Sequence, residues 1–285
     1  MLANVGLSVF EFTAGFIAGS VALMADALHN TNDAAALLIA YIARKISRQG
    51  ADHDFTFGYR RAELIGAMIQ LTALIIVGVY LIFEAAKRFF SPEPVLGGWV
   101  MVAAGVALVV DVVTAWLLWA MSKGSLNVKA AFLHNLTDAA ASIAVLLGGA
   151  AIFWLDWRWV DPTLSLIIAG YILYMSVGMI KSTTRILMEG TPPGVSLDNL
   201  KKAVESLADV RDVHHIHVWE LDEHHRALEA HIVIDGDLSG SAIDNLKPQI
   251  KSLLSEQFQI GHSTLEFESI DEACKESHIG FCCGR

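Results

Sequence analysis

Residues 62–90 read AELIGAMIQLTALIIVGVYLIFEAAKRFF, and this stretch decides the class of fold. From Leu64 to Phe83 no residue is charged, and apolar side chains follow one another instead of alternating with polar ones. A helix needs about 20 apolar residues to cross the hydrocarbon core of a bilayer, which is about 30 Å thick. Because a membrane strand would show alternation, the stretch predicts a transmembrane helix.

Five more stretches of this kind lie before residue 190. They are Leu2–Gly19, Val21–Arg44, Gly98–Met121, Val128–Leu155 and Val160–Ile186. The 285 residues are 54% hydrophobic, with a mean hydropathy of +0.49. Soluble domains are usually about 45–50% apolar. We therefore predict an α-helical membrane protein with six transmembrane helices over residues 1–189, embedded in a lipid bilayer.

The sequence Thr191-Pro192-Pro193-Gly194 ends the apolar part, because proline and glycine interrupt a helix. Residues 190–285 then show the shorter patterns of a soluble domain. The expected elements are a helix over Leu197–Leu207, strands over His214–Leu221 and Ala227–Ile234, a helix over Ser241–Gln257 and a strand over Ser263–Ser269. This order predicts a small α+β domain whose helices cover one face of a sheet.

Lysine and arginine gather on one side of the predicted helices. That side carries Arg44, Lys45, Arg48, Arg60, Arg61, Lys123, Lys129, Lys181 and Arg185, and the other carries Lys87, Arg88 and Arg158. Because positively charged loops stay in the cytoplasm, both termini and the tail domain are predicted to be cytoplasmic. The three cysteines, Cys274, Cys282 and Cys283, agree with this, because they form no disulfide framework.

The two parts of the chain also differ in charge. Residues 1–189 contain 12 basic and 13 acidic residues, and residues 190–285 contain 8 and 17, so their net charges are −1 and −9. An acidic domain that carries histidines suits metal cations and excludes nucleic acid as a partner. The N-terminal apolar segment is not preceded by basic residues, so no secretory signal peptide is predicted.

A His-x-x-x-Asp pair occurs twice inside the apolar part, as His29 with Asp33 and as His134 with Asp138. Both pairs stand in the frame Leu-His-Asn-x-x-Asp-Ala-Ala-Ala, and transporters often build sites from such repeated elements. Residues four apart share one face of a helix, so each pair can point at one spot. Two imidazoles and two carboxylates are a suitable shell for zinc.

Ionised aspartates inside a membrane cost at least ~2.5–3.5 kcal/mol each, so these pairs require a cation or protons. The alternative is that each pair only packs helices through a hydrogen bond. Because two matched pairs lie on different helices, we favour the metal site. Asp111, in the middle of another predicted helix, could be a proton carrier, a hydrogen-bond partner of the metal ligands or a helix–helix hydrogen bond, and we favour the last.

Several motifs together resemble the cation diffusion facilitator family, in its zinc-transporting branch. They are Leu23-Met24-Ala25-Asp26-Ala27-Leu28-His29 through Asp33, Phe57-Gly58-Tyr59-Arg60-Arg61-Ala62-Glu63, His134-Asn135-Leu136-Thr137-Asp138, Asp161-Pro162 and His214-His215-Ile216-His217-Val218-Trp219. The resemblance spans nearly the whole chain. It implies a homodimer of six-helix protomers, each with a ferredoxin-like cytoplasmic domain, and zinc export in exchange for protons.

The resemblance also implies particular metal ligands. The family's transport site matches His29, Asp33, His134 and Asp138, and His29 in place of an aspartate favours zinc over cadmium. The family's cytoplasmic metal site matches His214, His231 and Glu268, where zinc would be a regulatory ligand.

The chain departs from the family pattern at two places. A further metal site found in some members would use Asp52, but Phe55 and Tyr59 stand where that site has histidines. The fourth helix of members usually carries asparagine at the position of Asp111. An ion pair that crosses the dimer in some members maps onto Arg61 and Glu189.

Two other classes of function compete with a transporter. A membrane zinc metalloenzyme is disfavoured, because catalytic zinc keeps an open coordination position and no His-Glu-x-x-His motif occurs. A zinc-sensing membrane protein would share the features of the tail domain, but it does not need aspartates within the membrane. We therefore predict a secondary-active transporter and not an enzyme.

Overall fold

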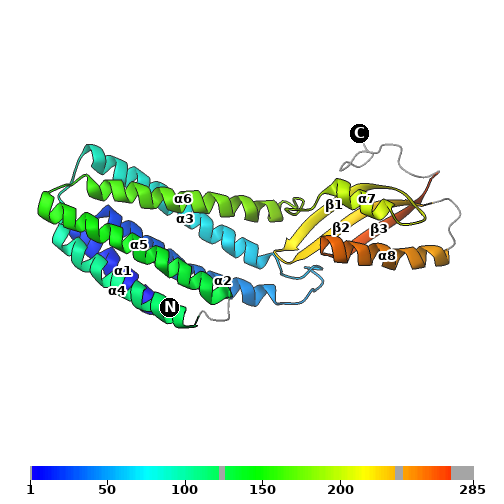
Figure 1. Ribbon diagram of the computed structural model, residues 1–285, viewed down its shortest axis with the longest axis horizontal. Helices are drawn as coiled ribbons and strands as arrows, with labels where there is room; N and C mark the ends of the chain where they lie inside the picture. Colours follow the sequence, from blue (N-terminus) through cyan, green and yellow to red (C-terminus); the bar gives the residue numbers. More distant parts are fainter. Residues whose placement is uncertain (1, 122–125, 235–239, 271–285) are drawn as a thin grey trace. The chain divides into compact units, whose positions relative to one another are not determined.

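The computed structural model describes residues 2–121, 126–234 and 240–270, without the side chains of residues 2–4, 118, 120–121, 126–131, 133–134 and 241. Six long helices come first in the chain (Figure 1). They are α1 (Leu2–Ala18), α2 (Val21–Ser47), α3 (Ala62–Phe90), α4 (Gly97–Met121), α5 (Leu126–Leu155) and α6 (Val160–Leu187). The prediction of a helical membrane domain is confirmed, with helix ends that differ by a few residues.

Four of the described helices are long and apolar enough to cross a membrane, namely α3, residues 97–117 of α4, residues 135–155 of α5, and α6. Helix α1 is apolar but shorter. Helix α2 is continuous, but its apolar sequence is interrupted by Asp26 and by the polar residues from His29 to Asp33. Large apolar side chains such as Phe16 and Tyr174 lie 74% and 78% exposed on the helices. A lipid environment accepts such side chains, whereas large exposed apolar surfaces are rare on soluble monomers.

Small residues allow the membrane helices to approach one another. Helices α4 and α5 come so close that a Cβ atom on Gly97 would lie 2.7 Å from the carbonyl oxygen of Gly149. Alanines such as Ala22 and Ala103 are fully buried between α1, α2 and α4. Close packing of small residues is the usual way in which helices associate in lipid.

Asp161, at the start of α6, fixes the start of α2. Its carboxylate accepts hydrogen bonds from the hydroxyl of Ser20 and from the backbone N–H of Val21, the latter at 2.9 Å. The first N–H groups of a helix have no partner within the helix, so a side chain that accepts from them stabilises it by about 1 kcal/mol. Asp161 is 2% exposed, and this bond therefore ties α6 to α2 within the membrane domain.

The tail domain contains a three-stranded sheet and two helices. Its elements are α7 (Leu197–Glu205), β1 (Val210–Asp222), β2 (His225–Ile234), α8 (Gly240–Phe258) and β3 (Ile260–Ser269). The sheet order is β1-β2-β3, with β1 antiparallel and β3 parallel to β2. Apolar residues of both helices, such as Leu200 and Ile250, pack on one face of the sheet. The predicted α+β order is confirmed.

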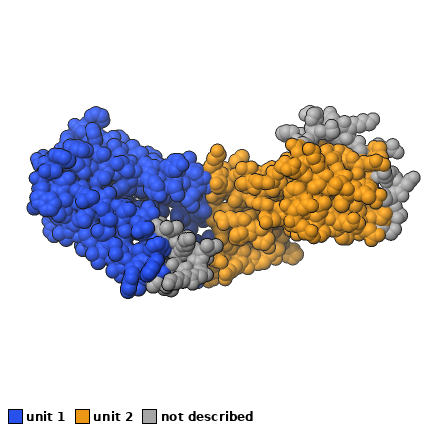
Figure 2. All heavy atoms as spheres, viewed as in Figure 1, with its two compact units in different colours: residues 1–43, 66–180 blue, residues 44–65, 181–285 orange. Residues whose placement is uncertain are grey.

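The chain divides into two compact units, and the division does not follow the Pro-Pro linker (Figure 2). One unit comprises residues 1–43 and 66–180, and the other comprises residues 44–65 and 181–285. The connection between α2 and α3 therefore belongs to the same unit as the sheet. Helices α2, α3 and α6 each continue from one unit into the other.

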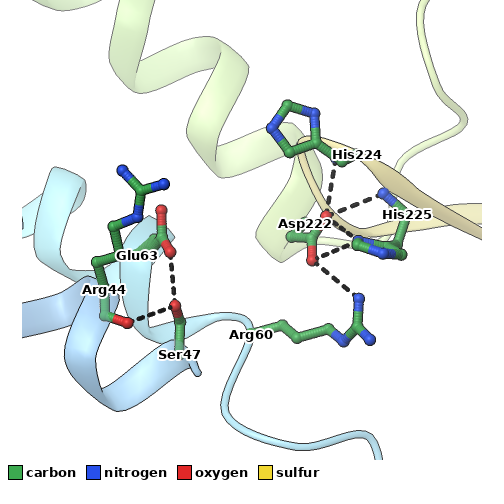
Figure 3. A network of polar contacts seen from close by, with 7 residues as sticks. All are labelled: Arg44, Ser47, Arg60, Glu63, Asp222, His224 and His225. Atoms are coloured by element: carbon green, nitrogen blue, oxygen red, sulfur yellow. Dashed lines mark hydrogen bonds and ion pairs between the residues drawn. The ribbon is translucent and has the colours of Figure 1, made fainter. Parts of the chain in front are cut away.

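Polar contacts join the α2–α3 connection to the turn between β1 and β2 (Figure 3). Nη1 of Arg60 is 3.4 Å from Oδ2 of Asp222, which ends β1. The same carboxylate accepts hydrogen bonds from the backbone N–H groups of His224 and His225, at 2.8 and 2.9 Å. A second ion pair, of 2.9 Å, joins Arg61 to Glu189 within this chain.

Candidate metal sites

The intramembrane candidate site brings together side chains of α2 and α5. Nε2 of His29 lies 3.7 Å from Oδ2 of Asp33 and 3.8 Å from Oδ1 of Asp138. Ligand atoms lie about 2.0–2.2 Å from a zinc ion, so atoms at these separations can share one ion after small side-chain movements. The predicted ligands of α2 and α5 thus converge, although Asp138 lies 109 positions after His29 in the sequence.

The fourth predicted ligand, His134, lies in α5, and its side chain is outside the described residues. Its position is one helical turn before Asp138, so the backbone puts it on the same face of α5.

A group of buried acids lies next to this site. Asn30 donates a hydrogen bond of 3.1 Å from Nδ2 to Oε2 of Glu11, which joins α2 to α1. Ser142 donates one of 2.9 Å from Oγ to Oδ2 of Asp111, which joins α5 to α4. The helix–helix hydrogen bond predicted for Asp111 is therefore present, and Asp111 can still carry a proton on its carboxylate.

The tail sheet carries the second candidate site on the face opposite the one that packs on α7 and α8. His214 of β1 and His231 of β2 are register partners, and Glu268 projects from β3. Nδ1 of His231 lies 2.5 Å from Oε1 of Glu268, and Nε2 of His214 lies 3.4 Å from Oε2 of the same carboxylate. The three residues predicted from the family resemblance therefore lie together.

His214 is oriented by a chain of charged groups behind it. Its Nδ1 is 3.1 Å from Oδ2 of Asp212, and Asp212 in turn pairs with Lys201. Partial burial acts to raise the pKa of Asp212, but the bonds and charges of Lys201 and His214 outweigh it, so that this pKa is lowered. A carboxylate on one ring nitrogen of a histidine leaves the other nitrogen free to bind a metal.

His215 is a further candidate ligand that the sequence analysis did not select. Ligand atoms of His214, His215 and His231 all lie within 4.8 Å of one another. His215 has a positive φ of 48°, and the β1–β2 register shifts between His214 and His217. This bulge turns His215 toward the same side as its neighbour, whereas strict alternation would put the two on opposite faces.

The buried nitrogens and oxygens of this cluster fit a metal ion. Nε2 of His214, both ring nitrogens of His215 and Oε2 of Glu268 are buried without a hydrogen-bond partner. Leaving buried polar atoms unpaired costs about 1–3 kcal/mol each, so a bound cation would satisfy them. Three imidazoles and one carboxylate match the ligand types that zinc prefers.

His262 and Asp52 have other partners. The rings of His262 and Phe57 meet edge to face, with their centres 5.7 Å apart. Cys274, Cys282 and Cys283 are outside the described residues. In the α2–α3 connection, the Asp52 carboxylate accepts hydrogen bonds from the N–H groups of Asp54 and Phe55 and from the hydroxyl of Tyr59. These bonds lower the pKa of Asp52; the bond from Phe55 has the largest effect, followed by that from Tyr59. Both carboxylate oxygens of Asp52 therefore accept hydrogen bonds within the loop.

Comparisons with known proteins show the family of this chain. The family profile described as the cation efflux transmembrane domain matches residues 1–188, and that of the cation efflux protein cytoplasmic domain matches residues 192–270. The chain belongs to the cation diffusion facilitator family. This cation efflux protein is a multi-pass membrane protein that transports divalent metal cations.

Curated relatives cover most of the cation efflux protein. A "Cadmium, cobalt and zinc/H(+)-K(+) antiporter" of Bacillus subtilis (strain 168) is 32% identical over 266 residues, which are 93% of this chain and 85% of the relative. "Zinc transporter ZitB" of Escherichia coli (strain K12) is 34% identical over 265 residues, 92% and 83% of the two chains. A solved metal-bound C-terminal domain of the CzcD transporter from Cupriavidus metallidurans is 28% identical, covers 26% of this chain and 99% of its own, and gives a TM-score of 0.24.

Proposed function

We propose that this protein is a Zn²⁺/H⁺ antiporter that exports zinc from the cytoplasm, with His29, Asp33, His134 and Asp138 as its transport site. The observation that carries the proposal is the convergence of His29, Asp33 and Asp138 from two helices within the membrane domain. The names of the relatives support zinc as the substrate and protons as the counter-ion.

The chemistry of the ligands explains why zinc and protons exchange. Zinc binds neutral imidazoles and ionised carboxylates, so protons compete with it for the same four groups. Zinc from the cytoplasm displaces protons from the inward-open site. After the site turns outward, protons that arrive from outside displace the zinc, which requires two states of the helices that carry the ligands.

The proposal extends to the tail and to assembly. Residues 1–189 form the membrane domain, and residues 190–285 form a cytoplasmic domain whose His214, His215, His231 and Glu268 bind a regulatory zinc ion. Both termini lie in the cytoplasm. The chain works as a homodimer, and zinc in the tail biases the membrane domain between its two states.

The test is zinc flux into proteoliposomes with an imposed pH gradient. Asp138→Asn should abolish flux, because it removes one anionic ligand while it keeps the shape of the side chain. Asp156→Asn makes the same chemical change on an exposed loop and should leave flux as in the wild type. Zinc flux at the wild-type rate in Asp138→Asn would refute the assigned site. Wild-type zinc flux that does not change when the pH gradient is imposed would refute antiport.

A membrane zinc metalloenzyme is the alternative from another class. It would require a substrate-sized cavity open at the metal site. Hydrolytic turnover by the purified protein, without zinc flux, would favour that alternative.

A further inference from the structure

Three acids on three different helices lie deep in the membrane domain. Glu11 of α1, Asp26 of α2 and Asp111 of α4 are 0%, 2% and 6% exposed. None of them belongs to the proposed transport site. Acids that are buried in a membrane are costly, and they are usually retained for a function.

These three acids, here called the acid layer, lie beside the transport site, with Asp26 and the partner of Asp111 one helical turn from its ligands. On α2, Asp26 shares a face with Asn30, which holds Glu11 through the 3.1 Å hydrogen bond. On α5, Ser142 shares a face with Asp138 and bonds to Asp111 at 2.9 Å. One turn corresponds to about 5.4 Å along a helix, which is close enough for strong electrostatic interaction but too far for a shared metal ligand.

Two oxygens in this layer have no hydrogen-bond partner. They are Oε1 of Glu11 and Oδ2 of Asp26, and both are buried. The surroundings do not offset their charge, because Glu11 interacts electrostatically with Asp111 and Asp138, and Asp26 interacts with all three of these acids. Like charges in such an environment cannot all stay ionised.

On the three helices that carry the layer, the sequence places lysine and arginine only in the last turns of α2. Helices α1 and α4 contain no lysine, arginine or histidine. Helix α2 has Arg44 and Lys45 only in its last turns, and the only lysine of α5 is Lys129, near its start. Asp138 of α5 interacts electrostatically with both Glu11 and Asp26, and His29 lies one helical turn after Asp26 on α2. A bound proton or cation would compensate the carboxylates.

We propose that Glu11, Asp26 and Asp111 form a proton-binding site that is separate from the metal site and that carries a counter-transported proton. The layer has no imidazole to favour zinc. Asn30 and Ser142 already donate hydrogen bonds to one oxygen of Glu11 and one of Asp111, which leaves at most four of the six carboxylate oxygens, fewer than the six to eight that calcium prefers or the six that magnesium requires. A proton on one carboxyl removes a charge and supplies a donor for a neighbouring carboxylate. This inference rests on the proposed antiport.

The place of the layer along the helices fits this role. Helix α2 continues from His29 to Arg44 and the α2–α3 connection, and Asp26 lies on the opposite side of His29. In the proposed orientation, that is the outer side of the metal site. Protons that enter from outside reach the acid layer before they reach the zinc ligands.

The experiment uses the full chain in lipid vesicles and measures the infrared carbonyl band of protonated carboxylic acids at neutral pH, with and without zinc. The variants are Glu11→Gln and Asp26→Asn, which keep the shape of each side chain, with Asp138→Asn for comparison. The band should be present in the zinc-bound wild type and should be lost in at least one of the two layer variants. Zinc affinity should change by less than about twofold in both layer variants but should fall more than tenfold in Asp138→Asn.

The same vesicles separate this proposal from the proposed function. The proton-to-zinc ratio of transport should fall in Glu11→Gln, while zinc binding persists. A wild type without the band, a band that survives in both layer variants, or a loss of zinc binding like that of Asp138→Asn would overturn the proton site. Wild-type flux that is indifferent to the pH gradient would instead refute antiport, whatever the infrared spectrum shows.

Discussion

At the scale of single residues, a substitution of His215 tests most directly whether the tail site binds a metal ion. A buried imidazole without a hydrogen bond on either nitrogen lowers the free energy of unfolding unless another group satisfies it. Its ring centre lies 4.7 Å from that of His231 and 5.1 Å from that of His214. Binding of a metal ion between these rings would offset the free-energy cost of burying the imidazole and of the strained backbone, which has a φ of 48° at His215.

We expect His215→Ala to weaken zinc binding in the tail by roughly tenfold or more, because it removes a direct ligand and not only an outer group. Zinc bound per chain should be measured by equilibrium dialysis in an Asp138→Asn background, so that only the tail site is counted. His224→Ala, on an exposed turn, is the matched control and should bind zinc normally. Equal affinities for the two variants would remove His215 from the ligand set.

The reason that His215 escaped prediction is physical. His214, His231 and Glu268 could be selected only because they match the cytoplasmic metal site of the family. The face that His215 occupies depends on a bulge and a left-handed residue, which arise from the pairing of β1 with β2. Sequence spacing does not contain that pairing. Ligation by any of these residues remains a prediction.

At the scale of elements, the turn between β1 and β2 and the α2–α3 connection depend on Asp222. Partial burial acts to raise the pKa of this carboxyl, but hydrogen bonds from His224 and His225 and the charge of His225 outweigh that effect and lower it. A group whose pKa is lowered by folding stabilises the fold above its ordinary pKa of 3.8 and loses that contribution as the pH falls through the folded value.

We therefore expect Asp222→Asn to reduce the melting temperature of the tail domain at neutral pH. This reduction should become smaller as the solution is acidified below pH 3.8. The measurement is thermal unfolding of the full protein in detergent, followed over a pH series. Asp198→Asn, at an exposed position of α7, should show no such trend. A difference between Asp222→Asn and wild type that does not change with pH would contradict the role of this carboxylate.

The lengths of the elements were predictable to different degrees. All six long helices follow from apolar runs, because the bilayer sets a minimum length that the sequence displays directly. Strand β1 begins at Val210 and not at His214, and β3 begins at Ile260 and not at Ser263. Irregular register hides the alternation at the start of β1. The grouping of residues 44–65 with the sheet depends on contacts such as that of Arg60 with Asp222, which no local pattern encodes.

At the scale of the whole molecule, the proposed orientation can be tested by cysteine accessibility. The background is a variant in which Cys274, Cys282 and Cys283 are replaced by serine. In inside-out vesicles, a membrane-impermeant thiol reagent should label Glu223→Cys in the tail and should not label Asp156→Cys between α5 and α6. The positive-inside rule gives this expectation. Labelling of Asp156→Cys alone would reverse the orientation, and detergent-opened vesicles should label both.

The polar face of α2 also has a consequence for how the protein is made. Among the described helices, α2 is long enough to cross a membrane but is not among the four that are apolar enough. The translocation machinery releases segments into lipid according to their hydrophobicity, and central aspartates oppose that release. Helix α1, which the tight Gly19-Ser20 turn joins to α2, would therefore have to enter the bilayer together with it as a hairpin. A chain synthesised without α1 would leave α2 at the membrane surface.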